Sequence, residues 1–171
     1  MDVFEAISQR RSVRSYQDRP VEDKALERIL EAARLAPSAN NRQEWKFVVV
    51  RDAELRNRLA EAARGQSFVA EAPVVIAACA AEHDHVMSCG HPCFLVDVAI
   101  ALEHIALAAR ALGLGTCWIG AFDQGKVRDI LGIPDSVEIV ELMPLGYPSD
   151  WPAPRGRKSL DDIVCYDGWQ D

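Results

Sequence analysis

The sequence predicts a layered fold of the α+β or α/β class, formed by a single domain over residues 1–171. Four short runs of apolar and β-branched residues read as strands, and segments with apolar residues at helical spacing lie between them. Polar, proline and glycine residues mark the ends of most of these segments. A chain of this length can bury about 70% of the surface that it exposes when unfolded, so one core suffices. No internal repeat, low-complexity stretch or linker interrupts the pattern.

The N-terminal part is predicted to contain two helices. Residues 2–9 form the first, because Asp2 and Glu5 have the spacing of a capping box. The second follows Pro20, with apolar residues at i, i+3, i+4 and i+7, and it is closed by Pro37. Its apolar positions are Leu26, Ile29, Leu30 and Ala33.

The remainder of the chain is predicted to alternate between strands and helices. Residues 46–50 form a strand, and Asp52 then caps a helix that ends before Gly65. A long buried helix over residues 95–112 is terminated by the glycines that follow it. The other elements are strands over 73–79, 116–119 and 137–145, a helix over 123–131, and a Pro, Gly and Arg-rich tail over 146–158.

Charge and apolar patterning exclude several classes of protein. The net charge of -7 argues against a nucleic-acid partner, since that binding rests on neutralising many phosphates. The longest apolar segment, 94–114, contains charged residues and reads as a core helix, so no membrane partner is expected. The N-terminus has no secretory signal pattern and the five cysteines fit reduced thiols, which together predict a cytoplasmic protein.

The cluster Arg10, Arg11, Ser12 and Arg14 is the most informative feature of this acidic chain. Guanidinium groups donate bidentate hydrogen bonds to phosphate oxygens, and a hydroxyl can complete such a cradle. The alternative is that these cations simply favour the C-terminal end of the preceding helix. The cluster alone leaves both interpretations open.

A second set of motifs favours the phosphate interpretation. Residues 10–14 and then 37–45 resemble the two N-terminal signatures of the nitroreductase family of FMN-dependent oxidoreductases. The long helix with its glycine turn at 113–120 is similar to a third part of the same family, and Leu145 to Pro148 together with the basic run 155–158 are similar to a fourth, the C-terminal end. Four motifs in the family's order make this a resemblance over essentially the whole chain.

The resemblance implies an α+β fold with a mixed central sheet flanked by helices, in an intertwined homodimer with two FMN sites at the subunit interface. One subunit would hold the FMN phosphate and ribityl chain, and the other would face the flavin ring. The implied cofactor-binding residues are Arg10, Arg11, Ser12, Arg14, Arg155 and Arg157 from the first group, Pro37, Ser38, Ala39, Asn41 and Gln43 from the partner, and Ile119 and Gly120 beside the ring.

The implied activity is electron transfer from NAD(P)H through bound FMN to a nitroaromatic, a quinone or a related small electron-poor acceptor, by a ping-pong mechanism. The flavin carries the chemistry, so no catalytic side chain is expected. The alternatives are a non-catalytic flavin-binding redox sensor, or a specialised flavin reaction such as dehalogenation or flavin breakdown on the same fold.

Several positions depart from the family or admit another interpretation. Glu44 stands where many members have proline, and no lysine occurs at 65–68, so Arg14 or Arg64 is the candidate substitute beside the flavin pyrimidine. The histidines and cysteines at 83–93 match no strong metal template, and no metal site is predicted. Asp97 and His104 lie on one helix face, where a hydrogen-bonded pair is favoured over a proton relay.

Overall fold

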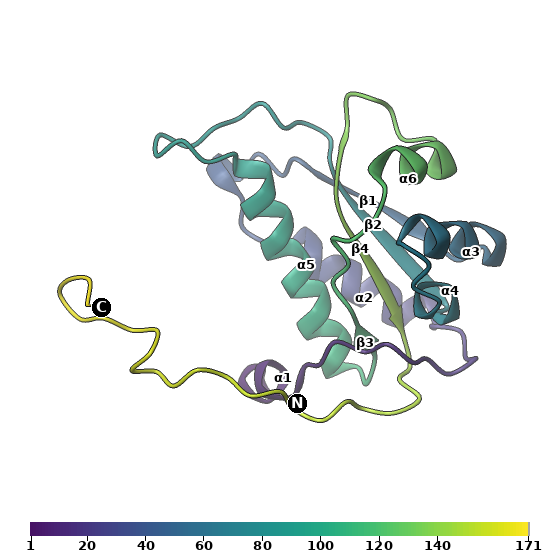
Figure 1. Cartoon of the computed structure of the whole chain (residues 1–171), viewed down its shortest axis with the longest axis horizontal. Coiled ribbons are helices and arrows are strands. Elements are labelled where there is room, and N and C mark those ends of the chain that lie inside the picture. Colours follow the sequence, from purple (N-terminus) through teal and green to yellow (C-terminus); the bar gives the residue numbers. More distant parts are fainter. Residues whose placement is uncertain (171) are drawn as a thin grey trace.

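The computed structural model describes residues 1–170 and contains helices around one sheet (Figure 1). The elements are, in order, α1 (Val3–Gln9), α2 (Asp23–Arg34), the 3-10 turn η1 (Ala39–Asn41), β1 (Trp45–Val50), α3 (Ala53–Ala62), α4 (Phe68–Glu71), β2 (Val74–Ala80), α5 (Cys93–Ala111), β3 (Gly115–Thr116), α6 (Gln124–Leu131) and β4 (Glu138–Gly146).

The sheet has the strand order β1-β2-β4-β3, and every ladder in it is antiparallel. Ala77 in β2 pairs with both Val48 in β1 and Leu142 in β4, so β2 and β4 form the centre. The α+β class is confirmed. Within residues 1–170, parallel pairing is limited to the isolated bridge between Ser12 and Thr116, so the mixed character of the sheet rests on that bridge.

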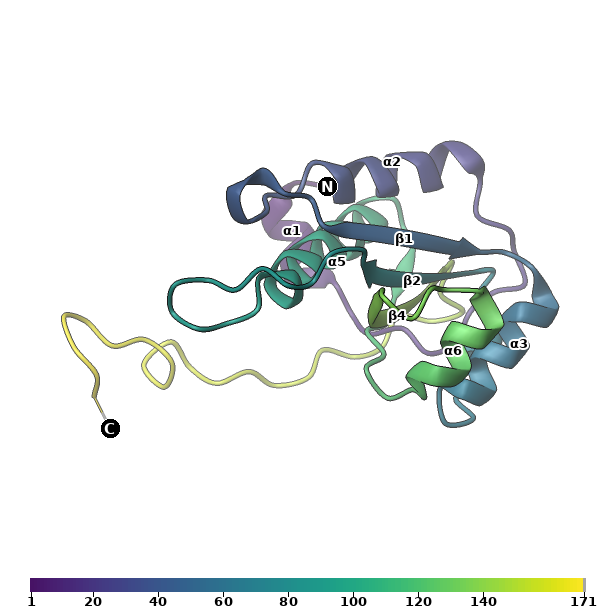
Figure 2. The same ribbon diagram turned by 90° about the horizontal axis from the view of Figure 1, so that it is seen from above.

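Helices cover both faces of the sheet, which explains why β2 is buried along its whole length (Figure 2). On one face Ile29 of α2 and Leu102 of α5 pack with Met143. On the other face Leu59 of α3 and Val127 of α6 pack with Leu142. A strand that is covered on both faces has a continuous apolar sequence, as β2 does.

Most predicted elements are found close to their expected bounds. The capping box of Asp2 and Glu5 is present at the start of α1, and Asp52 caps α3. The four-residue helix α4 was missed. The strand predicted over 116–119 was too long: it ends at Thr116, and only Ile119 pairs with β4 again, through a bridge to Leu142.

The segments 12–17 and 147–149 lie together beside β3. The Val13 N–H donates to Thr116 O at 2.9 Å, and Tyr16 forms a bridge with Pro148. The segment that carries the arginine cluster is therefore fixed to the sheet edge. Beyond Trp151 the tail is exposed; it first passes the end of α1, where residues 152–157 lie near the arginine cluster, and then extends away from the helices and the sheet (Figure 1).

Candidate functional site

The arginine cluster and the tail arginines line one pocket of about 180 Å³. We call it the arginine pocket. It is lined by Arg10, Arg11, Ser12, Arg14, Pro152, Ala153, Arg155 and Arg157. Segments nearly the whole chain apart thus bring five guanidinium groups and one hydroxyl to a single opening. No acidic side chain lines it.

The positive charge of this pocket is only partly compensated by the protein. Arg10 lies 3.4 Å from the Glu103 carboxylate on α5. Arg11 turns back to the carbonyls of Ser8 and Arg10, both at 2.8 Å, so it caps the end of α1. Within residues 1–170, Arg14, Arg155 and Arg157 form no ion pair with an acidic side chain. Clustered like charges repel one another, and a bound dianion relieves that repulsion.

Two groups outside the predicted set support the pocket. Burial raises the pKa of the half-buried Glu103, and a hydrogen bond from Trp118 together with the charge of Arg10 opposes that rise. Arg110 lies 3.9 Å from the centre of the Trp151 ring and donates to Gln9 at 2.6 Å. Burial and the nearby Arg11 lower the pKa of Arg110. No local sequence pattern signals either Glu103 or Arg110.

Ser12 is anchored to the floor of the pocket. Its backbone forms the parallel bridge to Thr116, and its side chain lies near the buried Cys117 thiol, whose pKa it lowers. Burial is the main cause that raises the pKa of Cys117, so this thiol stays protonated at neutral pH. The position of Ser12 is therefore fixed by the edge of the sheet.

The residues from the second motif lie elsewhere. Pro37, Ser38, Ala39, Asn41 and Gln43 surround η1, and the Ala39 N–H donates to the Asp97 carboxylate at 3.1 Å, near the N-terminal end of α5. Arg110, beside the arginine pocket, is near the other end of that helix. The two ends are about 20 Å apart along the helix. A single chain does not bring the two sets together.

Buried carboxylates hold this 37–43 loop from both sides. Asp97 is 4% exposed and binds Ala39, while Glu44 is 3% exposed and is paired with Arg42. The loop contains three non-glycine residues with positive φ: Asn40, Asn41 and Gln43. Such conformations are unfavourable unless the surroundings impose them. Glu44, where many family members have proline, therefore has a structural partner in this chain.

The expected Asp97–His104 pair was wrong. Asp97 accepts from Ala39, and the His104 ring nitrogen Nδ1 lies 3.0 Å from Ala32 O on α2. Each polar group is satisfied by backbone from a different element, which the helix periodicity alone cannot reveal.

Ile119 and Gly120 form a turn beside β4. Ile119 exchanges two backbone hydrogen bonds with Leu142, at 2.9 and 3.1 Å. Its N–H is therefore already used, and the exposed Gly120 is the residue of this turn whose N–H can donate to a ligand. Of the two candidate replacements for lysine, Arg14 lies 5.9 Å from the Phe68 ring centre, whereas Arg64 lines a separate surface hollow beside α6.

The 83–93 loop is a hairpin in which Val86 pairs with Pro92, and His83 packs edge-on against Phe94. Within residues 1–170 no three His, Cys, Asp or Glu side chains are grouped to hold a metal ion. Over the same residues, no helix combines the length and the apolar character needed to span a bilayer.

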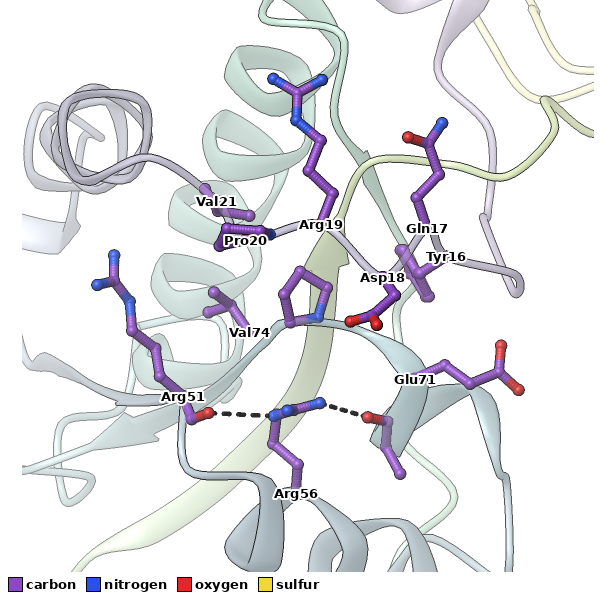
Figure 3. A pocket seen from close by; sticks show the side chains of 12 residues that line it. Tyr16, Gln17, Asp18, Arg19, Pro20, Val21, Arg51, Arg56, Glu71 and Val74 are labelled. Atoms are coloured by element: carbon purple, nitrogen blue, oxygen red, sulfur yellow. Dashed lines mark hydrogen bonds between the residues drawn. The ribbon is translucent and has the colours of Figure 1, made fainter.

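A larger cavity of about 530 Å³ lies between the 16–21 segment, α3 and α4 (Figure 3). Its cations already have partners. Arg56 binds the carbonyls of Arg51, Ala70 and Ala72, and Arg51 pairs with Asp23 at 2.6 Å. These contacts tie elements of the fold together, so the smaller arginine pocket is the better candidate for an anionic ligand.

Known proteins resemble this chain over nearly its whole length. A model of the nitroreductase family matches residues 7–70 and 63–147. An NADH dehydrogenase from Thermus thermophilus is 36% identical over 97% of this chain and 96% of its own length. An FMN reductase [NAD(P)H] from Bacillus subtilis is 34% identical, covering 91% of this chain and 70% of its own.

A solved structure agrees with these matches. A nitroreductase family protein from Clostridium novyi NT superposes with a TM-score of 0.84 at 34% identity, over 99% of this chain and 95% of its own. The fold, the order of the motifs and the matches all point to the same group of proteins, and the chain belongs to the nitroreductase family.

Proposed function

We propose that this protein is an FMN-dependent oxidoreductase that takes electrons from NAD(P)H and passes them to a nitroaromatic, a quinone or a related electron-poor compound in a ping-pong reaction. The arginine pocket carries the proposal, because it offers five guanidinium groups and one hydroxyl to an anion. The names of two relatives, an NADH dehydrogenase and an FMN reductase [NAD(P)H], support the choice of cofactor and electron donor.

The donor set fits the phosphate end of FMN. Arg10, Ser12 and Arg14 would hold the phosphate and ribityl chain, and Arg155 and Arg157 would add charge from the tail. Arg11 is turned toward backbone carbonyls, so its contribution is mainly the field of its charge. From Thr116, beside Ser12, to Gly120 the chain advances by at most about 13 Å. Residues near both ends of the 116–120 segment can thus lie close to one FMN molecule, at its phosphate and at its flavin ring.

FMN, when bound, accepts a hydride and passes electrons on; the protein orients it and excludes side reactions. The Gly120 N–H would donate to the ring edge, and the Arg14 guanidinium would stabilise negative charge near the pyrimidine end. Substrate and nicotinamide would use the same open face in turn. No side-chain nucleophile is needed.

A homodimer would complete the site. The 37–43 loop lies about 20 Å along α5 from the arginine pocket, so it would serve the partner's flavin through Pro37, Ser38, Ala39, Asn41 and Gln43. Exposed apolar side chains support an interface. Phe4 on α1 is 78% exposed and Leu160 in the tail is 73% exposed, so both are available for contact with a partner subunit. A monomeric mass by light scattering of the FMN-loaded protein would contradict the dimer.

We also infer that the protein acts in the cytoplasm. All five cysteines are free thiols, and two of them, Cys89 and Cys165, are exposed. Exposed thiols persist in a reducing compartment.

The test of this function is anaerobic visible spectroscopy of the FMN-loaded protein. NADH or NADPH should bleach the bound flavin, and a nitroaromatic or quinone should restore its colour. Flavin that binds but is reduced by neither nucleotide would instead identify a sensor.

The double variant Arg10→Ala with Arg14→Ala tests the pocket directly. It should weaken FMN binding by at least 100-fold, since each charge-assisted hydrogen bond contributes about 1.5–3 kcal/mol. The matched control is Arg28→Ala with Arg58→Ala, which removes the same charge from exposed positions on α2 and α3. Equal FMN affinity of the two double variants, measured by fluorescence titration, would refute the phosphate assignment.

A further inference from the structure

One carboxyl group lies against the Gly120 turn. The bridge between Ile119 and Leu142 brings Gly120 opposite Glu141 of β4. A Cβ atom built on Gly120 would lie 3.6 and 3.7 Å from the two Glu141 carboxyl oxygens. The Glu141 carboxyl thus lies beside the space that a side chain at position 120 would occupy, next to the residue that would meet the flavin ring.

This carboxyl has no partner of its own. Within residues 1–170 neither oxygen of Glu141 forms a hydrogen bond or an ion pair, although the residue is only partly exposed. Both oxygens retain some contact with solvent. Among residues 1–170, the side-chain polar atoms that are fully enclosed and lack a hydrogen-bond partner are Glu44 Oε2 and Arg110 Nε, and neither belongs to Glu141. A structural carboxylate in a protein normally has hydrogen-bond donors around it. Glu141 has an open path for a proton instead.

We propose that Glu141 takes up and releases the proton that accompanies electron transfer at this site. The proposal rests on the proposed function, because it requires a flavin ring beside Gly120. It assigns a role to a residue that lies outside all four motifs, on the strand behind the turn.

Hydride transfer from NAD(P)H brings two electrons and one proton, and so adds one negative charge to the site. The Glu141 carboxylate then binds one proton from solvent, and the charge is cancelled. Reduction of a quinone to a hydroquinone needs a hydride and a proton. The hydride leaves the reduced cofactor, the proton leaves the Glu141 carboxylic acid, and the oxidised cofactor and the carboxylate are restored.

The protonation equilibrium of Glu141 suits this role. Burial raises its pKa to about 7, and no neighbouring charge contributes to the shift. Negative charge added nearby raises the pKa further. Near neutral pH the group would therefore change its proton occupancy when the cofactor changes its charge.

The titratable groups on the adjacent elements are either neutral thiols or side chains that have partners of their own. From the turn segment, the Cys117 thiol has a pKa raised mainly by burial. From β2, burial raises the pKa of Cys79 to about 11, so both thiols stay neutral. From α5, the polar side chains have other partners: Asp97 binds Ala39, Glu103 binds Arg10 and Trp118, and His104 lies against Ala32 O.

The test measures the midpoint potential of bound FMN between pH 6 and 9 by anaerobic dye equilibration. The wild type and the variants Glu141→Gln and Glu138→Gln would be compared. Glu138 lies on the same strand and its carboxylate accepts from Gln124 at 3.0 Å, so Glu138→Gln is the matched control. One extra proton for each two electrons steepens the pH dependence by about 30 mV per pH unit. Wild type and Glu138→Gln should show this extra slope above pH 7, and Glu141→Gln should lack it.

A second measurement needs no variant. On anaerobic reduction by NADH in weakly buffered solution at pH 7.5, the wild type should take up a proton from solvent, reported by a pH-indicator dye. Equal slopes in all three proteins, or no proton uptake by reduced wild type, would overturn the role of Glu141 while leaving the oxidoreductase in place. Wild type that binds no FMN would overturn both.

Discussion

A single methyl group added at Gly115, by the substitution Gly115→Ala, should disturb the arginine pocket by displacing Val13. A Cβ atom there would lie 2.4 Å from Val13 Cγ2, 2.8 Å from Val13 Cβ and 3.0 Å from Pro148 Cγ. Ordinary carbon contacts begin near 3.4 Å, so Val13 must move by about 1 Å. Val13 is fully buried and its N–H donates to Thr116 O, so the movement carries Ser12 and Arg14 with it.

The expected cost of Gly115→Ala follows from this overlap. Overpacking a close-packed site costs about 1–3 kcal/mol. In a chain of this size each kcal/mol lowers Tm by about 2–4 °C, so a fall of about 2–12 °C is expected. Displacing one charge-assisted hydrogen bond to the phosphate should weaken FMN binding by about tenfold to 100-fold.

Differential scanning fluorimetry and FMN titration would measure the two effects. Gly125→Ala is the matched control, because the added Cβ would meet only Asp123 Oδ1 at 3.5 Å. Gly125 lies in the first turn of α6, where alanine is favoured over glycine by about 0.5–1 kcal/mol. The control should raise Tm slightly and leave FMN affinity unchanged. If Gly115→Ala keeps both its Tm and its FMN affinity, the close approach of Val13 does not position the pocket.

Two further predictions concern stability. Leu102→Ala should destabilise the fold by about 2–5 kcal/mol, because Leu102 is fully buried between α5 and the sheet; denaturant unfolding measures this, and a loss below about 1 kcal/mol would contradict the packing. Since the pKa of Glu141 is raised to about 7 in the folded protein, its stabilising contribution is present below pH 4.5 and is lost as pH rises to about 7. The Tm of Glu141→Gln relative to wild type should therefore increase over that range in FMN-free protein, and a pH-independent difference would show that burial does not perturb this carboxyl.

Local patterns sufficed for most of the fold and for one contiguous group of the candidate residues. The apolar run of β2, the periodicity of α2 and the capping box of α1 each encode an element within a few residues, and all three were found. Helix α4 has four residues, too few for a periodicity to be visible. The contiguous arginine cluster lines one pocket together with Arg155 and Arg157, and its role in binding stays a prediction.

Contacts between distant residues could not be predicted in this way. Glu103 pairs with Arg10 because α5 packs beside the end of α1, and Glu141 lies opposite Gly120 because Ile119 pairs with Leu142. The first contact depends on helix packing and the second on strand register. Both place a carboxyl group next to candidate site residues, and neither leaves a local signal in the sequence.

The tail has consequences for assembly because its two halves differ in character. Its first half supplies Arg155 and Arg157 to the arginine pocket, and its second half exposes Leu160 and Ile163. In the proposed dimer an anion that fixes the first half also restricts the second, so the partner meets a tail that has already lost part of its freedom. Reciprocity then requires that the factor by which FMN tightens the dimer equals the factor by which dimerisation tightens FMN. Cofactor supply would thereby control how much of the protein is assembled.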